Sequence, residues 1–537
     1  MGLIKGLILL MLCVPAFILN AQDNRYMVFF KDKAGSSYSI SDPSAFLSAR
    51  AIERRNRQGL VAITQDIPVN ENYIQGVSAT GASVVHATRW MNGVLVSCDE
   101  ATLSSIQALP YVDRFEFVAP GGKPASSGRR RISARTTETG ESLVTANQLS
   151  LLGLDDMHTS GYTGEGVYIA VLDAGFPGVN TAGAFSHIFE DNRMIDTYDF
   201  VHDDPDAFVQ SNHGTNVFSV IAGYVPDAYT GGAYGASFQL YVTEDVGGEY
   251  RIEEYNWLFA AERADSTGAD IITTSLGYNT FDDPSMNYSK DDLDGLTSVI
   301  ARAAQWASDR GIAVVSSAGN EGSNSWETIT TPADNESVIA VAATNSAGVR
   351  SPISSVGPSA DGRIKPDVGA MGIGVSVVNP AGTFGMSSGT SLAAPLVTSL
   401  LAGVWQKLPH LQGRKLIEAV RLSASQAENP DFLLGYGIPN FQAIVNKLEW
   451  LPQDRPMTVS PNPTPDTVII RPADSTKATT CFVEILSLQG QVLSSQEVAF
   501  DWIRKGFEAD CSKLAAGMYL LRVRTGEEVY SFKVVKL

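Results

Sequence analysis

The 537-residue chain is poor in cysteine and in positive charge. Beyond the N-terminal stretch only Cys98, Cys481 and Cys511 remain, too few for a disulfide scaffold. Cys481 and Cys511 lie in one late segment, and whether they pair stays open from the sequence. Lys and Arg number 39 against 58 Asp and Glu, a net charge of −19. Such an acidic chain repels phosphate backbones, so we predict no nucleic-acid partner.

Long apolar runs are also scarce. Residues 1–21 combine the basic Lys5, a short apolar run over residues 7–19 and the small Ala21, which predicts a cleaved secretory signal peptide. A membrane-anchoring helix is the alternative interpretation. No later run approaches about 20 apolar residues, so the mature chain is expected to have no transmembrane anchor.

The composition changes along the chain and indicates several domains. Residues 22–120 predict a small α+β domain, with a strand at 26–30, a helix at 44–57, a strand pair in 81–99 and a helix followed by a strand in 101–118. Residues 121–141 are rich in Gly, Pro, Ser and Arg and predict a linker. Residues 451–537 begin with a proline-rich linker and then alternate like the antiparallel strands of a small β-sandwich.

Residues 142–450 have a different pattern. Short apolar segments alternate with helical stretches, including those at 253–266 and 293–310. The apolar segments are VYIAVLDAG, SFQLYVTED, ADIITTSLGY, IAVVSSAGN and SVIAVAAT. This alternation predicts an α/β domain with a doubly wound parallel sheet covered by helices on both faces. In such folds, active groups gather at the carboxyl ends of the strands.

Four polar residues stand at expected strand ends or helix starts. Taken singly, Asp173 and Asn320 are typical turn residues, and His213 and Ser391 are typical of helix starts. Together, the order Asp, His, Ser is one of three known for serine catalytic triads. A serine hydroxyl needs an imidazole to take its proton, and the imidazole needs a carboxylate to fix its tautomer. A helix amino end at Ser391 would add N–H donors where negative charge develops.

These residues lie in the blocks VLDAG, HGTNVFSVIAG, TSLG, SSAGNEG and SGTSLAAP. The series, over about residues 155–446, resembles the motifs of the subtilisin-like serine peptidases, or subtilases. The resemblance implies an endopeptidase of doubly wound α/β fold, with Asp173, His213 and Ser391 as the triad and Asn320 as the oxyanion donor. It also implies substrate-binding residues, namely Ser275, Leu276, Gly277, Ser317, Ala318 and Gly319.

The sequence departs from the family pattern in small ways. Asn216 replaces a second histidine that is not the catalytic base, so the triad is retained. Structural calcium is common in the family, and the acidic stretches 202–206 and 290–294 are candidates. Neither has a recognisable ligand spacing, so solvated loops are favoured and no metal ligand is assigned. The chemistry is expected to need no cofactor. Glu321, beside Asn320, is a weak candidate for favouring basic substrate side chains.

The flanking regions resemble companions of the same family. Residues 26–118 resemble inhibitory prodomains, and PSAFLSARAIERRNRQG resembles those of secreted Bacteroidetes subtilases. The C-terminal blocks VSPNPT, LSLQGQVL and LAAGMYLLRVRTGEEVYSFKVVKL resemble sorting domains of type IX secretion. The expected protein is therefore a zymogen, exported through the periplasm and secreted or held at the cell surface. Its expected partners are protein or peptide substrates, its own prodomain and the secretion machinery. An ordinary β-sandwich for surface binding is the alternative for the C-terminal region.

Short motifs of this chain also occur in other enzyme classes. GMSSG at 385–389 satisfies the nucleophile elbow of α/β-hydrolases, but that fold needs an acid and a histidine after the serine, and only His410 follows. Sedolisin-type peptidases share SGTS but use glutamate where this chain has His213. A catalytically silent, protein-binding pseudo-peptidase is the remaining alternative, although every triad residue is present.

Overall fold

The computed structural model describes residues 23–121, 137–138, 145–450, 457–472, 480–499, 506–525 and 528–537. The predicted signal peptide and most of the predicted linker at 121–141 lie outside the described residues. The chain divides into two compact units, Met1–Val445 and Asn446–Leu537.

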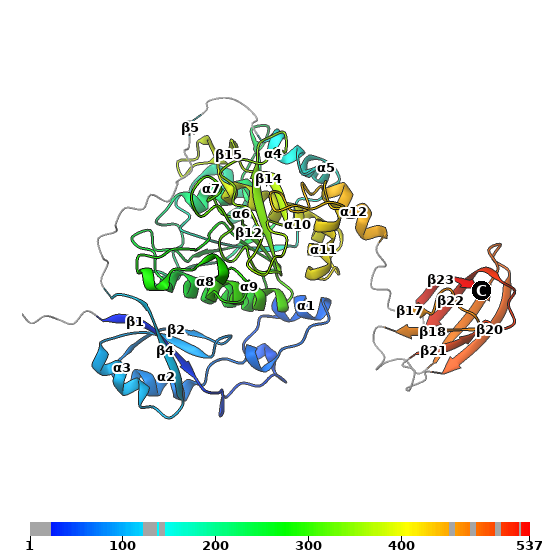
Figure 1. Cartoon of the computed structure of the whole chain (residues 1–537), viewed down its shortest axis with the longest axis horizontal. Coiled ribbons are helices and arrows are strands. Elements are labelled where there is room, and N and C mark those ends of the chain that lie inside the picture. The colour runs from blue at the N-terminus through cyan, green and yellow to red at the C-terminus, as the bar shows by residue number, and fades with distance from the viewer. Residues whose placement is uncertain are drawn as a thin grey trace, which may run out of the picture. The chain divides into compact units, whose positions relative to one another are not determined.

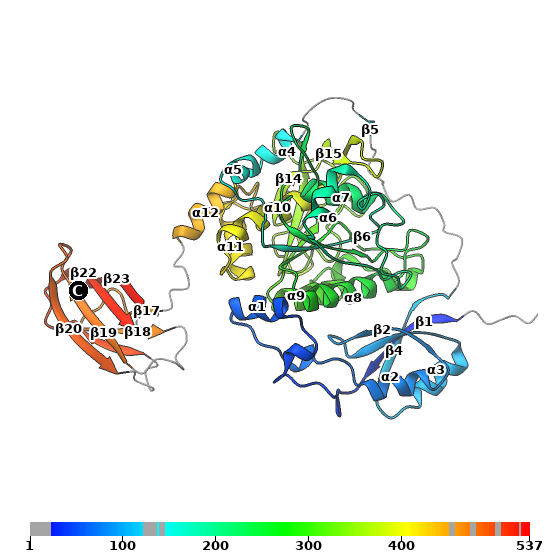
Figure 2. The ribbon, with the colours of Figure 1, turned by 180° about the vertical axis from the view of Figure 1, so that it is seen from behind.

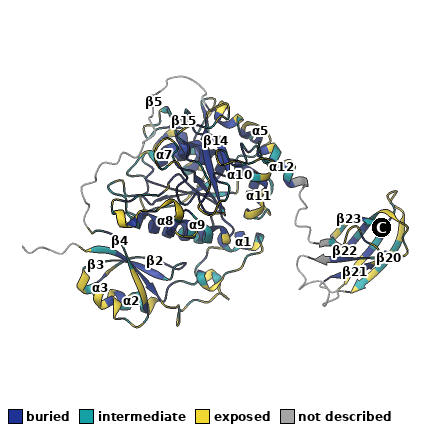
Figure 3. Ribbon diagram, viewed as in Figure 1, coloured by how far each residue is buried: buried dark blue, intermediate teal, exposed yellow. Residues whose placement is uncertain are grey.

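A seven-stranded parallel sheet forms the centre of the first unit, in the order β14-β13-β12-β11-β6-β10-β7. Its strands are β6 (Tyr168–Asp173), β7 (Met194–Asp199), β10 (Ser237–Val242), β11 (Ile271–Thr274), β12 (Ala313–Ser317), β13 (Val338–Thr344) and β14 (Val368–Met371). Most of their residues are buried, as expected for a sheet covered on both faces (Figure 3). The predicted doubly wound α/β fold is confirmed.

Helices cover both faces of this sheet. Figure 1 shows α8 (Ile252–Thr267) and α9 (Val299–Asp309) between the sheet and the N-terminal domain. The helices α7 (His213–Ala222) and α10 (Thr390–Lys407) pack together on the other side, as the view from behind also shows (Figure 2). The remaining helices here are α4 (Ala146–Ser150), α5 (Leu154–Thr159), α6 (Ser186–Glu190), α11 (Gly413–Ser423) and α12 (Phe441–Trp450).

Short elements complete the unit. The strands β15 (Val375–Val378) and β16 (Phe384–Ser387) form a hairpin that leads into α10, and β5 (Thr137–Glu138) pairs with β16. A second small pair is β8 (Tyr224–Val225) with β9 (Tyr229–Thr230). Single 3-10 turns lie at Pro43–Ala45, Thr64–Asp66, Gly183–Phe185, Pro284–Met286 and Lys290–Asp292.

The N-terminal domain is a four-stranded antiparallel sheet in the order β2-β3-β1-β4. Its strands and helices are β1 (Asn24–Phe30), β2 (Ser83–Thr88), β3 (Gly93–Cys98), β4 (Val112–Ala119), α1 (Ala49–Arg57), α2 (Glu71–Ser78) and α3 (Glu100–Gln107). Alternate side chains of β1 pack in two different cores, because successive side chains of a strand point to opposite faces of the sheet. Tyr26 and Val28 face the domain's own core, whereas Met27 and Phe29 join the core that contains α8 and α9.

Two predicted helices start later than expected. The helix predicted at 44–57 begins at Ala49, because Ser48 Oγ accepts a hydrogen bond from Ala51 N (3.1 Å) and caps it. The helix predicted from residue 293 begins at Val299, because Ser298 Oγ accepts from Ala301 N (3.1 Å) in the same way. In both cases, a 3-10 turn precedes the cap and extends the apparent helical pattern.

The second unit contains two antiparallel sheets, β17-β18-β21 and β20-β19-β22-β23. Their strands are β17 (Met457–Ser460), β18 (Thr467–Pro472), β19 (Thr480–Leu486), β20 (Val492–Ala499), β21 (Phe507–Asp510), β22 (Gly517–Thr525) and β23 (Glu528–Lys536). Both sheets contribute to one core, which includes Ile470, Phe507 and Val523. Cys481 and Cys511 lie buried in this core as free thiols. Among the described residues, no helix is both long and apolar enough to cross a membrane.

Candidate active site

Asp173 ends β6, which lies between β10 and β11 in the sheet. Its side chain is fully buried. Its Oδ1 accepts a hydrogen bond from Ala174 N (2.7 Å) and lies 2.7 Å from Nδ1 of His213. The strand end therefore presents a fixed carboxylate oxygen to the imidazole ring.

His213 is the first residue of α7, and its side chain keeps 26% of its surface exposed. The next residue must be glycine, because a Cβ at Gly214 would clash with the carbonyl oxygen of Gly175 and touch Asp173 Cβ. This close approach brings the start of α7 against the end of β6. The bond at Nδ1 leaves the other edge of the ring directed away from the carboxylate.

Ser391 lies in the first turn of α10, directly after Gly389 and Thr390, and is 7% exposed. Pro395 has no N–H, so the helical hydrogen bond to the Ser391 carbonyl cannot form. Ser275 Oγ, just beyond β11, donates to that carbonyl instead (2.8 Å). The start of α10 is thereby fastened to the carboxyl end of the sheet.

Asn320 reaches the same helix start from beyond β12. Its Oδ1 accepts hydrogen bonds from the backbone N (2.9 Å) and the hydroxyl (3.0 Å) of Thr390. A Cβ placed on Gly389 would lie 3.4 Å from Ser391 Oγ and 3.6 Å from Asn320 Nδ2. Ser391 Oγ and Asn320 Nδ2 therefore both border the small space that a side chain at Gly389 would occupy.

The two expected substrate-binding segments emerge beside each other. Ser275, Leu276 and Gly277 follow β11, whereas Ser317 ends β12 and Ala318 and Gly319 follow it. Because β11 and β12 are neighbouring parallel strands, both segments reach the edge that carries Asp173. Gly277 is exposed, whereas both backbone groups of Ala318 are used in bonds to Val341 and Thr330. The structure thus brings all ten predicted residues to this edge of the sheet; the ten are Asp173, His213, Ser275, Leu276, Gly277, Ser317, Ala318, Gly319, Asn320 and Ser391.

The two acidic stretches considered for calcium form local contacts. In 202–206, Asp204 and Asp206 accept from backbone N–H groups two residues later. In 290–294, Asp294 accepts from the backbone of Leu296 and Thr297. Such bonds within turns are typical of solvated loops.

A different acidic group, not predicted from the sequence, brings three carboxylates within 4.8 Å of one another. These are Glu244, Glu249 and Glu253, and no other such group of three metal-ligating side chains occurs among the described residues. They are spaced five and four residues apart, which matches no ligand motif, so the sequence carried no usable signal for them.

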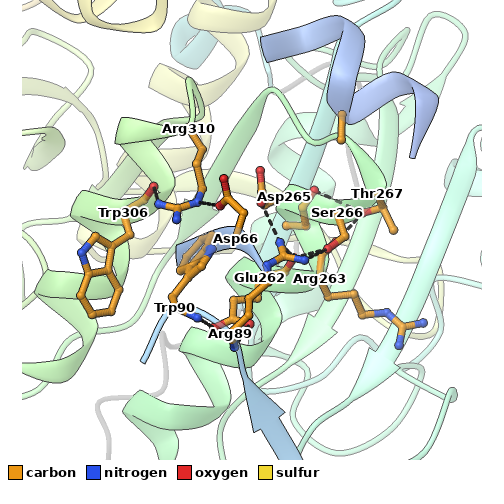
Figure 4. Close-up of polar contacts among 12 residues, drawn as sticks. Asp66, Arg89, Trp90, Glu262, Arg263, Asp265, Ser266, Thr267, Trp306 and Arg310 are labelled. Atoms are coloured by element: carbon orange, nitrogen blue, oxygen red, sulfur yellow. Dashed lines mark hydrogen bonds and ion pairs between the residues drawn. The ribbon is translucent and has the colours of Figure 1, made fainter. Parts of the chain in front are cut away.

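The N-terminal domain docks on α8 through buried charges (Figure 4). Glu262 accepts hydrogen bonds from the backbone N–H groups of Arg89 (2.9 Å) and Trp90 (3.0 Å), and Asp265 accepts from the Arg89 side chain (2.7 Å). Arg54 and Arg55 of α1 also bind Asp265. Burial alone would raise the pKa of Asp265, but the surrounding guanidinium groups outweigh it and hold that pKa far below its usual value.

Comparison with known proteins shows the family to which this chain belongs. The profile described as "Peptidase_S8: Subtilase family" matches residues 164–437, about half of the chain. The chain belongs to the subtilase family. It is 28% identical over 378 residues to Subtilisin NAT of Bacillus subtilis subsp. natto, covering 68% of this chain and 84% of that protein. It is 31% identical over 296 residues to a subtilisin of Bacillus pumilus, covering 53% and 94%.

This subtilase also matches two further family profiles. Residues 25–133 match the "Peptidase S8 propeptide domain, Bacteroidota", and residues 458–537 match the "Secretion system C-terminal sorting domain". A solved structure titled as the MycP3 protease of a type VII (ESX-3) secretion system is 20% identical, with a TM-score of 0.47, and the match covers 58% of this chain and 92% of that one. The subtilase is a serine-type endopeptidase with a propeptide, and its sorting domain identifies it as a secreted or cell-surface protein.

Proposed function

We propose that this subtilase cleaves peptide bonds through an acyl-enzyme formed on Ser391. His213 removes the proton from the Ser391 hydroxyl as Oγ attacks the carbonyl carbon, and later delivers that proton to the leaving amine. The single observation that carries this proposal is the 2.7 Å contact between His213 Nδ1 and Asp173 Oδ1 at the same sheet edge as Ser391. Asp173 holds the ring in the tautomer whose Nε2 carries no proton and can accept one.

The negative charge that develops on the substrate oxygen needs donors that are already in place. Asn320 supports this role, because Thr390 fixes its Oδ1 and leaves Nδ2 beside Ser391. The backbone N–H of Ser391, at the amino end of an 18-residue helix, is the second proposed donor. All these groups belong to the protein, so the proposed reaction uses no cofactor. Water then attacks the acyl-enzyme with His213 as base and releases the second product.

Reaction with a fluorophosphonate would distinguish an active peptidase from a catalytically inactive protein that only binds other proteins. The reagent forms a stable bond only with an activated serine, so we expect labelling at Ser391, located by peptide mass spectrometry. Failure of the processed protein to label, together with no hydrolysis of any peptide, would favour the silent alternative.

Replacement of Asn320 by leucine should lower turnover by about 10²–10³-fold and leave the Michaelis constant nearly unchanged. Leucine is similar in volume but donates no hydrogen bond, and the lost interaction belongs to the transition state rather than to the bound substrate. Steady-state kinetics on a chromogenic peptide would measure both constants. A change confined to the Michaelis constant would show that Asn320 only shapes the binding surface.

We also propose that residues 22–120 form the inhibitory domain, that the linker at 121–141 is cut during maturation, and that 142–450 is the peptidase. The propeptide match and the docking on α8 support this division. In this arrangement, the prodomain is a partner of its own enzyme, and calcium is not assigned to any residue.

Deletion of residues 457–537 should leave catalysis intact and retain the protein in the periplasm. The deleted segment belongs to a unit with its own core, so its loss removes little from the peptidase. Cell fractionation and peptidase assays of each fraction would measure both effects. The full-length Ser391→Ala protein is the control, because it should be exported without being active. Normal appearance of the truncated protein in the medium would reject the sorting role of this region.

A further inference from the structure

The helix α1 lies outside the apolar core of its own domain. No described residue between Phe30 and Val69 belongs to the core of the four-stranded sheet. The segments on both sides of α1 are mostly loop. Most of residues 31–48 are exposed on one side, and Val61 is 75% exposed on the other. Exposed loops are preferred sites of proteolysis, so cuts in these segments would separate α1 from the sheet of its domain.

Arginine side chains hold α1 against the peptidase domain instead. Arg54 is 0% exposed, forms an ion pair with Asp265 of α8 and donates to the carbonyl of Ala269 (2.6 Å). Arg50, one turn earlier, forms an ion pair with Asp270. Both carboxylates are buried, and each is paired with a guanidinium group of α1. This part of the peptidase domain therefore suits a helix that carries arginine on one face.

The two residues that cap α1 also bind the peptidase domain. At the start of the helix, Ser48 N donates to the carbonyl of Ser266 (2.9 Å). At its end, Gln58 Nε2 donates to the carbonyl of Gly311 (2.6 Å), and Gln58 Oε1 accepts from Gly413 N (3.0 Å). The peptidase domain thus contacts α1 along its whole length, from one cap to the other.

These contacts lie at the edge of the sheet opposite the proposed catalytic residues. Asp270 directly precedes β11, and Gly311 lies two residues before β12. Asp270 also accepts from the backbone N of Tyr168 (2.9 Å), the first residue of β6, whereas Asp173 is the last. Five residue steps along a strand separate these two ends by about 16 Å. A helix bound at the amino ends therefore leaves the substrate segments at the carboxyl ends open.

We propose that this amino-end surface is a separate, non-inhibitory binding site for α1, and that residues 48–58 stay on the mature enzyme after the rest of the propeptide is digested. The surface is formed by Asp265, Ala269, Asp270, Gly311 and Gly413. An isolated helix of this length is marginal in water, so its contacts with the surface would keep it helical and protected from cleavage. The inference rests on the proposed maturation, because α1 becomes separate only when the propeptide is cut.

Mass spectrometry of the mature enzyme tests whether the helix is retained. The full chain would be allowed to mature, or would be digested by an added endopeptidase if it does not mature itself. The enzyme would then be separated from free fragments by gel filtration. Denaturation should release a peptide that contains residues 49–58, in a nearly equimolar amount, whereas fragments of β1 to β4 should be absent. The second route makes this result independent of catalysis by Ser391.

A synthetic peptide of residues 44–60 tests which side chains the surface recognises, without altering the folded protein. A labelled peptide would be exchanged into enzyme treated with fluorophosphonate, and unlabelled variants would compete with it. Arg54→Ala should compete about 30-fold or more weakly than the parent peptide, because it leaves a buried carboxylate without its partner. Asn56→Ala is the matched control, since Asn56 is exposed, and it should compete as well as the parent. On active enzyme, the saturating parent peptide should leave hydrolysis of a chromogenic substrate unchanged.

Three results would overturn the proposed site. The first is a digested enzyme that carries no peptide from residues 49–58. The others are equal competition by the Arg54→Ala and Asn56→Ala peptides, and inhibition of hydrolysis by the parent peptide. Failure of the proposed function has a different signature, in which the protein neither reacts with fluorophosphonate nor cleaves any substrate, while retention of the helix and competition by the peptides remain measurable.

Discussion

Replacement of Ser391 by alanine is expected to lower turnover by about 10⁶-fold while the protein stays folded, the size of loss known for the corresponding change in subtilisin. The change removes one hydroxyl from a residue that is 7% exposed, and the hydrogen bond from Ser275 Oγ to the Ser391 carbonyl remains. Circular dichroism would confirm the fold, and a chromogenic peptide assay would measure the loss. The propeptide would remain attached if maturation is autocatalytic, which N-terminal sequencing would reveal.

Ser388→Ala is the matched control, since it removes a hydroxyl three residues earlier in the same segment. That hydroxyl accepts from Gly374 N (3.0 Å), so its loss should affect local stability more than chemistry. Full hydrolysis by pure Ser391→Ala protein would refute the assignment of the nucleophile. Complete removal of the propeptide from that protein would show instead that another peptidase performs the maturation cut.

Replacement of Asp173 by asparagine should lower turnover by about 10⁴-fold, with little change in the Michaelis constant. Asparagine preserves the shape, but its Nδ2 donates a hydrogen bond, which favours the His213 tautomer that cannot accept the serine proton. Steady-state kinetics would measure the loss, with active sites counted by fluorophosphonate labelling carried to completion.

A second aspartate–histidine pair provides the control for this change. Asp199 ends β7, and its Oδ2 lies 3.0 Å from Nδ1 of His202. Asp199→Asn alters the same kind of contact at another strand end, and turnover per labelled site should remain close to that of the parent. Similar losses in both variants would mean that Asp173 acts through stability rather than through His213.

The order of the main strands and helices could be predicted because their apolar patterns are strong. The strands β6, β10, β11, β12 and β13 all lie in segments identified from the sequence. By contrast, β7 reads MIDTYD and β14 reads VGAM. The first is half polar and the second is four residues long with an internal glycine, so neither has a clear strand pattern. Their places at the two ends of the sheet are consistent with this weak signal.

Part of the candidate site could be predicted because the order Asp, His, Ser in one chain suggests a catalytic triad. Asp173, His213 and Ser391 were proposed on that basis, and the parallel sheet explains why they lie at one edge of it. The hydrogen bond from Ser275 Oγ to the Ser391 carbonyl could not be predicted from the sequence. It depends on Pro395, which has no N–H for that carbonyl, and on the end of β11 lying next to the start of α10. The acidic group at Glu244 was missed for a similar reason, since only the fold brings a strand end, a loop and a helix start together.

The core that the N-terminal domain shares with α8 affects how the proposed inhibition by this domain would end. Met27, Phe29 and Trp90 lie in one continuous cluster with Trp257 and Phe259 of the peptidase domain. The proposed cut in the linker would remove a covalent tether and break none of these contacts. The severed fragment would therefore remain bound until it is diluted below its dissociation constant or is itself digested. Activity should then rise after a lag whose length depends on how fast the fragment is digested. At high enzyme concentration, the released fragments would also inhibit other enzyme molecules.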